Sequence, residues 1–428
     1  MTQTPRPRES APRGYPAVVG PADPVLTAVV VALVAFGVVM VFSASAVFAS
    51  RTYDDPFRFL FRQTAFAVVG LVLMLGIARV DYHRYRPLTY VPLGGAVVLL
   101  LAVVLGFGRT AGGASRWIQL GPINIQPAEI AKLALILWLA YSLSKKRESI
   151  RSFQIGFLPH VLMAGILALL CLKQPDFGSA VMITLLTFVL LFTAGARLGY
   201  LLGAVLVALP IAYLLVVGNE YRMNRIRAFL APFEHRHDVG YQVAESLMSF
   251  GAGGVTGVGL GDSRQKLFYL PEAHTDFISA IVGEELGFVG VAMLIAAFVL
   301  VVWRGLRAAA GAADDYGTYL AVGITMFLGL QSFTNLAVAM GLLPTKGLVL
   351  PFISYGGSSL LVNCAAVGIL LNVSRARSTQ EADEAAGDPP ADSNDETGRR
   401  TRRRRSKQNR RRAKGVGVGV VAPGGSVG

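Results

Sequence analysis

The stretch Gly259-Leu-Gly-Asp-Ser-Arg-Gln-Lys-Leu-Phe-Tyr-Leu-Pro-Glu-Ala-His-Thr-Asp276-Phe is a polar, titratable segment that ends where a long apolar run begins. A helix needs about 20 residues to cross the hydrocarbon core of a bilayer, and the run over 276–303 is long enough. A carboxylate at the mouth of such a helix is costly, and it is kept mainly where chemistry or transport uses it. Asp276 is therefore the first candidate for a functional residue.

Apolar runs of similar length recur on both sides of this one. The chain has 428 residues, of which 53% are hydrophobic and 15% are charged. Windows of membrane length predict spans at 25–48, 61–79, 88–107, 127–144, 154–172, 178–195, 198–217, 276–303, 317–342 and 356–374. We therefore predict an all-α polytopic membrane protein with ten transmembrane helices in one bundle, and a large outer-face loop, about 218–275, between helices 7 and 8.

The distribution of basic residues predicts the orientation. The even-numbered spans are followed by Arg79, Arg84, Arg86, Lys145, Lys146, Arg147, Arg197, Arg304, Arg307, Arg375 and Arg377. Short cytoplasmic loops carry an excess of Lys and Arg, so these loops and both termini are expected in the cytoplasm. The long loop then lies on the outer face, although it also carries basic residues. Long loops translocate regardless of their charge, but an anion-binding site would explain these residues equally directly.

The segments outside the spans divide the rest of the chain. We expect a cytoplasmic N-terminal tail over 1–24, a membrane domain over 25–375 and a disordered cytoplasmic tail over 376–428, acidic at first and then basic. Beside a bilayer, an arginine run meets anionic lipid or an acidic partner more often than nucleic acid, so no nucleic-acid ligand is predicted. Cys171 and Cys364 fall in apolar spans without metal-ligand spacing, and no metal site is predicted.

Four stretches carry a resemblance to a known family. They are the segment ending in Asp276 with Gly283-Glu-Glu-Leu-Gly287 after it, then 113–132, 174–180 and 344–359. Together, over about 25–375, the chain resembles the SEDS family (shape, elongation, division and sporulation) of bacterial cell-wall proteins. Pro344-Thr-Lys346-Gly, which begins the last of these stretches, is similar to the division-type branch of that family.

The resemblance implies a peptidoglycan glycosyltransferase that polymerises lipid II at the outer face of the bacterial cytoplasmic membrane, at the division septum. The 4-hydroxyl of one disaccharide attacks the anomeric carbon of another, and undecaprenyl diphosphate leaves with inversion. Asp276 matches the family's essential aspartate and is expected to be the general base, because desolvation raises the pKa of a carboxylate toward a useful range. The alternative is that Asp276 only caps the eighth helix.

Further site residues follow from the same resemblance. Cations are expected on the leaving diphosphate, although each of them could instead reach lipid headgroups. The expected substrate-binding residues are Arg116, Arg225, Lys266, His274, Lys346, Ser354 and Ser358. Supporting polar contacts inside the bundle are expected from Glu129, Lys132, Asp176, Glu284 and Glu285, with a helix cap as the other interpretation of Asp176.

The implied partners are the lipid II substrate, a class B penicillin-binding protein acting as septal transpeptidase, and other division proteins that the cytoplasmic tail could recruit. No cofactor is predicted. A divalent cation that screens the diphosphate stays open, although the outer loops show no compact set of carboxylates with a coordination pattern. Two other functions stay open as well: a flippase that moves lipid II across the membrane, and a scaffold for the transpeptidase.

Overall fold

A computed structural model describes residues 21–111, 114–121, 123–267 and 270–387. The chain divides into two units, 1–379 and 380–428, and the helical bundle belongs to the first. The predicted N-terminal tail up to residue 20 and the predicted basic tail segment lie outside the described residues. Helix α12 (Gly357–Gly387) continues past residue 376, where the sequence predicts the start of the disordered tail. Ala and Glu dominate 381–386, and Gly387 with two following prolines ends the helix-forming sequence.

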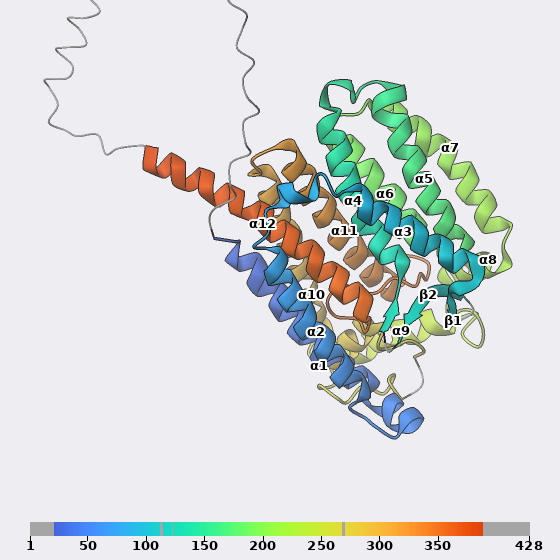
Figure 1. The fold of residues 1–428 in the computed structure, drawn as a ribbon. Coiled ribbons are helices and arrows are strands. Elements are labelled where there is room, and N and C mark those ends of the chain that lie inside the picture. Colours follow the sequence, from blue (N-terminus) through green and yellow to red (C-terminus); the bar gives the residue numbers. More distant parts are fainter. Residues whose placement is uncertain (1–20, 112–113, 122, 268–269, 388–428) are drawn as a thin grey trace, which may run out of the picture. The chain divides into compact units, whose positions relative to one another are not determined.

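Among the described residues, ten apolar helices form the bundle, and each overlaps one of the expected spans (Figure 1). They are α1 (Pro24–Tyr53), α2 (Arg58–Ile77), α3 (Tyr90–Ala102), α4 (Pro127–Lys145), α5 (Leu158–Lys173), α6 (Phe177–Thr193), α7 (Leu198–Val217), α10 (Ile278–Ala310), α11 (Asp315–Ala339) and α12. Within the described ranges, nine helical stretches are long and apolar enough to cross a membrane, and α6 is a shorter apolar helix. The predicted all-α polytopic membrane fold is confirmed.

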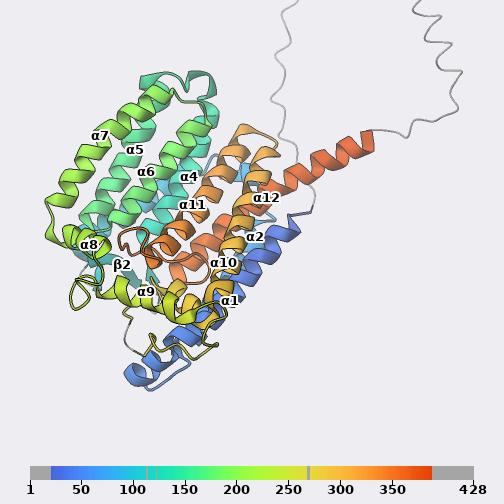
Figure 2. The same cartoon turned by 180° about the vertical axis from the view of Figure 1, so that it is seen from behind.

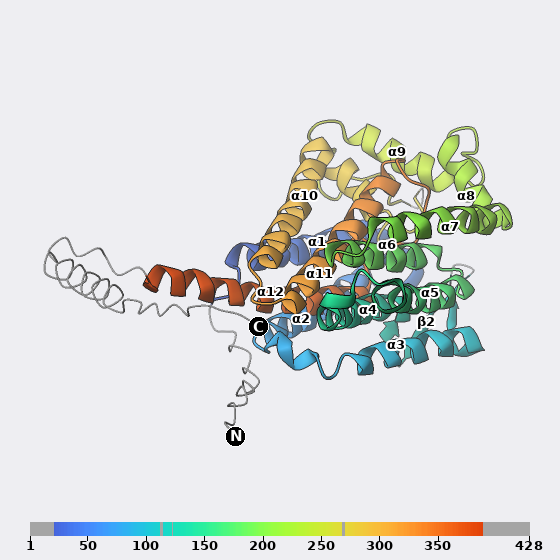
Figure 3. The ribbon, with the colours of Figure 1, turned by 90° about the horizontal axis from the view of Figure 1, so that it is seen from above.

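Burial differs greatly among these helices. In α4 and α11, 72% of the membrane-length window is buried inside the protein, whereas in α7 only 6% is buried. Figure 3 shows α7 at the edge of the bundle. The two central helices carry polar side chains such as Lys132 and Gln331, which a helix in lipid could not hold without partners. Polar spans are therefore placed inside the bundle, and the most apolar surface faces outward.

A small antiparallel sheet interrupts the helical pattern between α3 and α4. Its strands are β1 (Arg109–Ala111), β2 (Ala114–Leu120) and β3 (Ile123–Ile125), in the order β1-β2-β3. Gly121, with a φ of 60°, lies in the tight turn between β2 and β3, a conformation that glycine adopts without strain. The all-α expectation missed this sheet, whose strands are too short to give a clear alternating pattern.

The long connections gather at one end of the bundle, which we call the loop end (Figures 1 and 2). It holds the sheet together with α8 (Glu220–Leu230) and α9 (Tyr241–Gly253), the two helices of the long loop. Helix α10 also begins there, and it is interrupted at Gly287, whose φ of 63° and ψ of −161° are not helical. The first segment of α10, 278–286, is thus a separate short helix that directly follows Asp276.

Candidate active site

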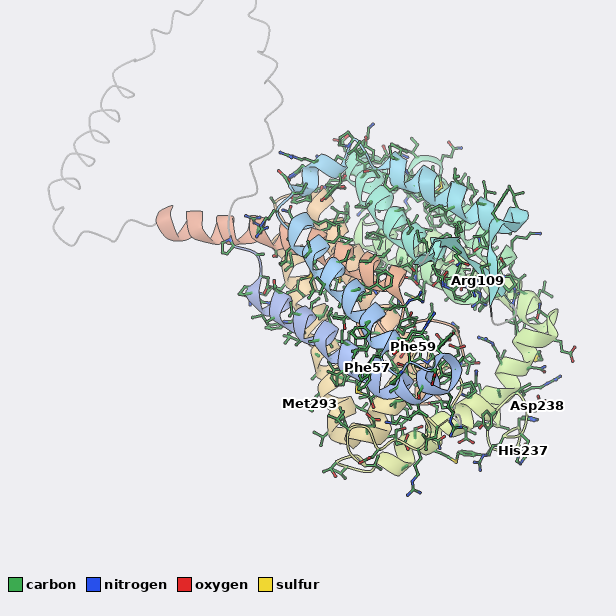
Figure 4. The ribbon with its side chains drawn as sticks, turned by 60° about the horizontal axis from the view of Figure 1, so that its bottom comes forward. Phe57, Phe59, Arg109, His237, Asp238 and Met293 are labelled. Carbon is green, nitrogen blue, oxygen red and sulfur yellow. The ribbon has the colours of Figure 1, made fainter. Side chains whose placement is uncertain are left out.

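A cavity of about 740 Å³ opens at the loop end. Phe59 of α2 and Arg109 of β1 line it from different elements, and both are labelled in Figure 4. Its polar lining is Arg62, Arg109, Arg116, Asn124, Gln126, Asn224, Arg225, Gln242, Glu272, Thr275, Asp276, Thr345, Ser358 and Ser359. Four arginines and two carboxylates therefore face one space, and Asp276 is one of the two.

The backbone around Asp276 is held by three consecutive carbonyl groups. The amide of Tyr355 donates to the carbonyl of His274 at 2.9 Å, and Ser354 Oγ donates to that of Thr275 at 2.6 Å. The side-chain amide of Asn335 donates to the carbonyl of Asp276 at 2.8 Å. The same Asn335 nitrogen also donates to the carbonyl of Leu348, so the turn before α10 is fixed to the segment 344–359. The position of Asp276 thus depends on residues more than fifty positions away in the chain.

The carboxylate of Asp276 faces the cavity. No described residue makes a hydrogen bond or an ion pair with it, and α10 begins without a side-chain cap, so the capping alternative is wrong. Burial, and to a smaller extent the charge of Glu272, raise the pKa of Asp276 to about 7 against the opposing effect of Arg225 and Arg116. A carboxylate with a pKa near 7 can accept a proton at neutral pH.

Two of the predicted cations flank Asp276. Arg116 NH2 donates to the carbonyl of Pro175 at 2.5 Å, and Arg225 NH1 donates to that of Thr345 at 2.7 Å. Arg116 Nε is buried without a hydrogen-bond partner. A Cβ at Gly347 would lie 3.2 Å from Arg116 NH1 and 3.5 Å from Asp276 Oδ2, so only glycine leaves this space open. The guanidinium of Arg116 therefore has hydrogen-bonding capacity left beside the carboxylate.

The other predicted substrate-binding residues are divided between the lining and the surrounding structure. Ser358 lines the cavity, and its Oγ accepts a hydrogen bond from the backbone amide of Gln126. Lys346 does not line it; Lys346 Nζ lies 5.8 Å from the ring centroid of Phe177, and burial lowers its pKa. Ser354 acts on the backbone of Thr275, as described above.

His274 and Lys266 also lie outside the lining. The ring of His274 packs among Phe48, Phe59 and Tyr355, and burial lowers its pKa, which favours the neutral form. Lys266 is buried, and its Nζ lies 2.9 Å from Glu285 Oε1. The assignment of Lys266 to the diphosphate is therefore corrected: its charge is already neutralised inside the protein.

The supporting residues make internal contacts. Lys132 Nζ lies 2.7 Å from Glu129 Oε1, with both side chains buried. Lys132 also contacts Gln331, whose side-chain amide donates to the carbonyl of Val349. Asp176 accepts from the amide of Ser179 at 3.0 Å as the N-cap of α6, which was the alternative interpretation of this residue.

Several lining and positioning residues were not singled out from the sequence. Arg62 and Arg109 line the cavity, and Glu272 is the carboxylate that raises the pKa of Asp276. Arg109 comes directly before the recognised 113–132 stretch, which was a usable signal. Arg62 and Asn335 lie inside apolar spans, and their role follows only from packing. Among the described residues, no group of three or more His, Cys, Asp or Glu side chains is placed to hold a metal ion.

Comparisons with known proteins agree with one another. A family model described as cell cycle protein, FtsW/RodA/SpoVE, matches residues 24–379. The probable peptidoglycan glycosyltransferase FtsW of Geobacter metallireducens is 50% identical over 353 residues, which is 82% of this chain and 94% of the relative. Stage V sporulation protein E of Bacillus subtilis is 42% identical over 356 residues, 82% of this chain and 97% of the relative.

Solved structures match over the same region. A structure of a peptidoglycan synthase complex, described as coordinating polymerization and crosslinking, has a TM-score of 0.69 and 31% identity, covering 83% of this chain and 98% of that one. The rod shape determining protein RodA of Thermus thermophilus has a TM-score of 0.62 and 32% identity, covering 83% of this chain and 97% of that one. The residues matched by the family model include the helical bundle and the residues that line the cavity.

Proposed function

The chain belongs to the FtsW/RodA/SpoVE family of cell cycle proteins, and we propose that it is a peptidoglycan glycosyltransferase that polymerises lipid II, with Asp276 as general base. The observation that carries the proposal is the unpaired carboxylate of Asp276, with a pKa of about 7, facing a cavity lined by four arginines. A base and a set of cations are the two things that sugar transfer from a diphosphate requires.

In the proposed reaction, the 4-hydroxyl oxygen of the acceptor sugar forms a bond to the anomeric carbon of the donor. As this bond forms, the hydroxyl gives its proton to Asp276. The bond between that carbon and the diphosphate oxygen breaks, and the diphosphate leaves with the electron pair. Attack from the opposite side inverts the anomeric carbon. Each turnover therefore moves one proton to Asp276, which must release it before the next.

The arginines supply the electrostatic part of the mechanism. Arg116 and Arg225 flank Asp276, and both are oriented by backbone carbonyls, so they are already in place before substrate binds. Fixed donors of this kind stabilise developing negative charge without reorganisation. Arg62 and Arg109 are exposed in the same cavity and are suited to the phosphate and sugar groups farther from the carboxylate. They replace Lys266 in the substrate-binding set that we propose.

The biological setting is proposed from the motifs and the relatives. Pro344-Thr-Lys346-Gly and the FtsW relatives support a division-type enzyme acting at the septum, with both termini in the cytoplasm. The matched peptidoglycan synthase complex supports a class B penicillin-binding protein as partner, with other division proteins bound through the tail. The alternative of a lipid II flippase would use the bundle without the chemistry at Asp276.

The decisive measurement is lipid II polymerisation by the purified wild type and by Asp276→Asn, with and without divalent metal and the transpeptidase partner. We expect the variant to fold and bind lipid II but to lose polymerisation by about 10²- to 10⁴-fold, which is the usual contribution of a general base. Asp262→Asn is the matched control, because Asp262 is exposed on the same loop. Normal glycan synthesis by Asp276→Asn would refute the assigned base, and lipid II flipping without glycan product would favour the flippase.

A further inference from the structure

The interruption of α10 at Gly287 is filled by another part of the chain. In an unbroken helix the amides of Phe288 and Val289 would donate to the carbonyls of Glu284 and Glu285. Here they donate instead to the carbonyls of Gly254 and Val255, at 2.9 and 3.1 Å. The two released carbonyls accept from the amides of Val258 and Gly259, at 3.0 and 3.1 Å. The segment 254–259, which we call the docking segment, thus replaces both hydrogen bonds that the break removes.

The docking segment can approach this closely only because glycines meet at the contact. A Cβ at Gly257 would lie 2.1 Å from the carbonyl oxygen of Glu285, and a Cβ at Gly287 would lie 2.3 Å from the amide of Gly257. A Cβ at Gly253 would lie 1.9 Å from the carbonyl oxygen of Gly283. The glycine run of the long loop is therefore the surface on which one backbone lies against another.

Residues 261–266, which follow the docking segment, are held against α10 and α1 by charged side chains. Lys266 Nζ donates to Glu285 Oε1 at 2.9 Å, to Ser43 Oγ of α1 at 3.3 Å and to the carbonyl of Gly261, which uses its three protons. Ser43 Oγ lies 2.6 and 2.8 Å from the two oxygens of Glu285. Glu284 accepts from Ser263 Oγ and from the amide of Arg264. Both glutamates immediately precede the break.

Asp276 lies two residues before the start of the same short helix. Residues 278 and 285 are roughly 10 Å apart along the helix axis, at 1.5 Å per residue. The segment 278–286 is buried almost throughout, so it is packed against its neighbours along its length. Its N-terminal end is fixed by Asn335, Ser354 and Tyr355, and its C-terminal end by the docking segment and Lys266. Release of the second contact would leave the polar contacts at the N-terminal end alone to fix the helix within its packed surroundings.

We propose that the docking segment and the Lys266–Glu285 ion pair are positioning elements of the active site, which hold the short helix 278–286 and thereby the carboxylate of Asp276 at its working position. This inference rests on the proposed function of Asp276. It assigns Lys266 a role in aligning the base rather than in binding the diphosphate. A buried pair of this kind fixes one arrangement, because either charge alone is strongly unfavourable there.

The test uses Lys266→Met in the full chain with its partner, followed by hydrogen exchange and steady-state polymerisation. We expect faster amide exchange in peptides covering 254–260 and 286–290, and a kcat lowered at least about tenfold with KM changed less than about threefold. Arg264→Met is the matched control. Arg264 lies two residues before Lys266 and its side chain is exposed, so this variant removes one positive charge without breaking a buried pair, and both readouts should stay at wild-type values.

The double variant Lys266→Met with Glu285→Gln provides the rescue. Removing both charges leaves no unpaired ion, so exchange and kcat should return to within about threefold of wild type, while Glu285→Gln alone should resemble Lys266→Met. If Lys266→Met fails to fold, Ser43→Ala, which keeps the ion pair, should give a smaller change of both readouts in the same direction. Faster exchange with unchanged kcat, or unchanged exchange, would overturn the inference.

Asp276→Asn separates this inference from the proposed function. It should show wild-type exchange in 254–260 and 286–290 together with lost polymerisation. Retained polymerisation in that variant would refute the function of Asp276, whatever the exchange shows. Wild-type kcat in Lys266→Met would refute the positioning role and leave the function of Asp276 untouched.

Discussion

Asp276 and Glu285 are carboxylates at opposite ends of one short helix, and their surroundings differ in every respect. Glu285 is buried against Lys266 and Ser43, which satisfy both of its oxygens. Asp276 faces a cavity, has no described partner for its carboxylate and has a pKa raised to about 7. The first carboxylate is held in a buried ion pair and serves structure. The second changes its charge near neutral pH, which is what a base requires.

The largest expected effect is on stability. It concerns Glu129, a second paired carboxylate, and would sharpen the contrast between paired carboxylates and the unpaired Asp276. Lys132→Met leaves Glu129 buried without its cation, so we expect a loss of about 3–5 kcal/mol in the free energy of unfolding. Thermal unfolding in detergent measures it. The double variant Lys132→Met with Glu129→Gln should recover most of the loss, and a single-variant loss under about 1 kcal/mol would show that the pair is not fixed as described.

The second effect concerns the unpaired carboxylate and pH. Because the base must be ionised, kcat/KM should fall about fivefold from pH 7 to pH 6 and about ninefold more to pH 5, or roughly 50-fold in all. The pKa of Asp276 is about 7 in the folded protein and 3.8 in the unfolded chain. Ionisation of Asp276 therefore lowers the stability of the folded state as the pH rises from 3.8 to about 7. Asp276→Asn should therefore be more stable than wild type at pH 8, and this gain in stability should be smaller at pH 5.

Rate profiles and unfolding midpoints over pH 5–8 check both parts. Glu272→Gln offers an independent probe, since Glu272 raises the pKa of Asp276 and its removal should move the acid limb to lower pH. A rate that does not change below pH 7 would contradict the assignment of Asp276 as the titrating base.

The smallest effect tests the cations around the unpaired carboxylate. Arg62→Gln and Arg109→Gln each remove one charge from the cavity lining without touching the flanking Arg116 and Arg225. We expect KM for lipid II to rise about tenfold, with a smaller change in kcat, because charge-assisted phosphate contacts are worth roughly 1.5–3 kcal/mol. The exposed Arg227→Gln serves as the control. Unchanged KM in both lining variants would remove these arginines from the substrate site.

The sequence predicted the parts of this protein that depend on local pattern. Apolar runs of membrane length determined the ten helices, because a bilayer requires both that length and internally satisfied backbone. Asp276 stood out because a carboxylate beside such a run is rare, and the motifs around it carried the family resemblance. Arg116 and Arg225 followed from the same reasoning and line the cavity with it.

Only the tertiary structure decided what each charged side chain contacts. Lys266 and Arg116 look alike in sequence, as basic residues on outer loops, yet one pairs with Glu285 and the other retains an unpartnered nitrogen beside Asp276. The break at Gly287 likewise could not be predicted from the sequence, because a glycine in an apolar run is compatible with a continuous helix. The physical reason is the same in each case: pairing of charges and backbone groups depends on segments brought together from distant parts of the chain, whereas the length and polarity of a helix are local properties.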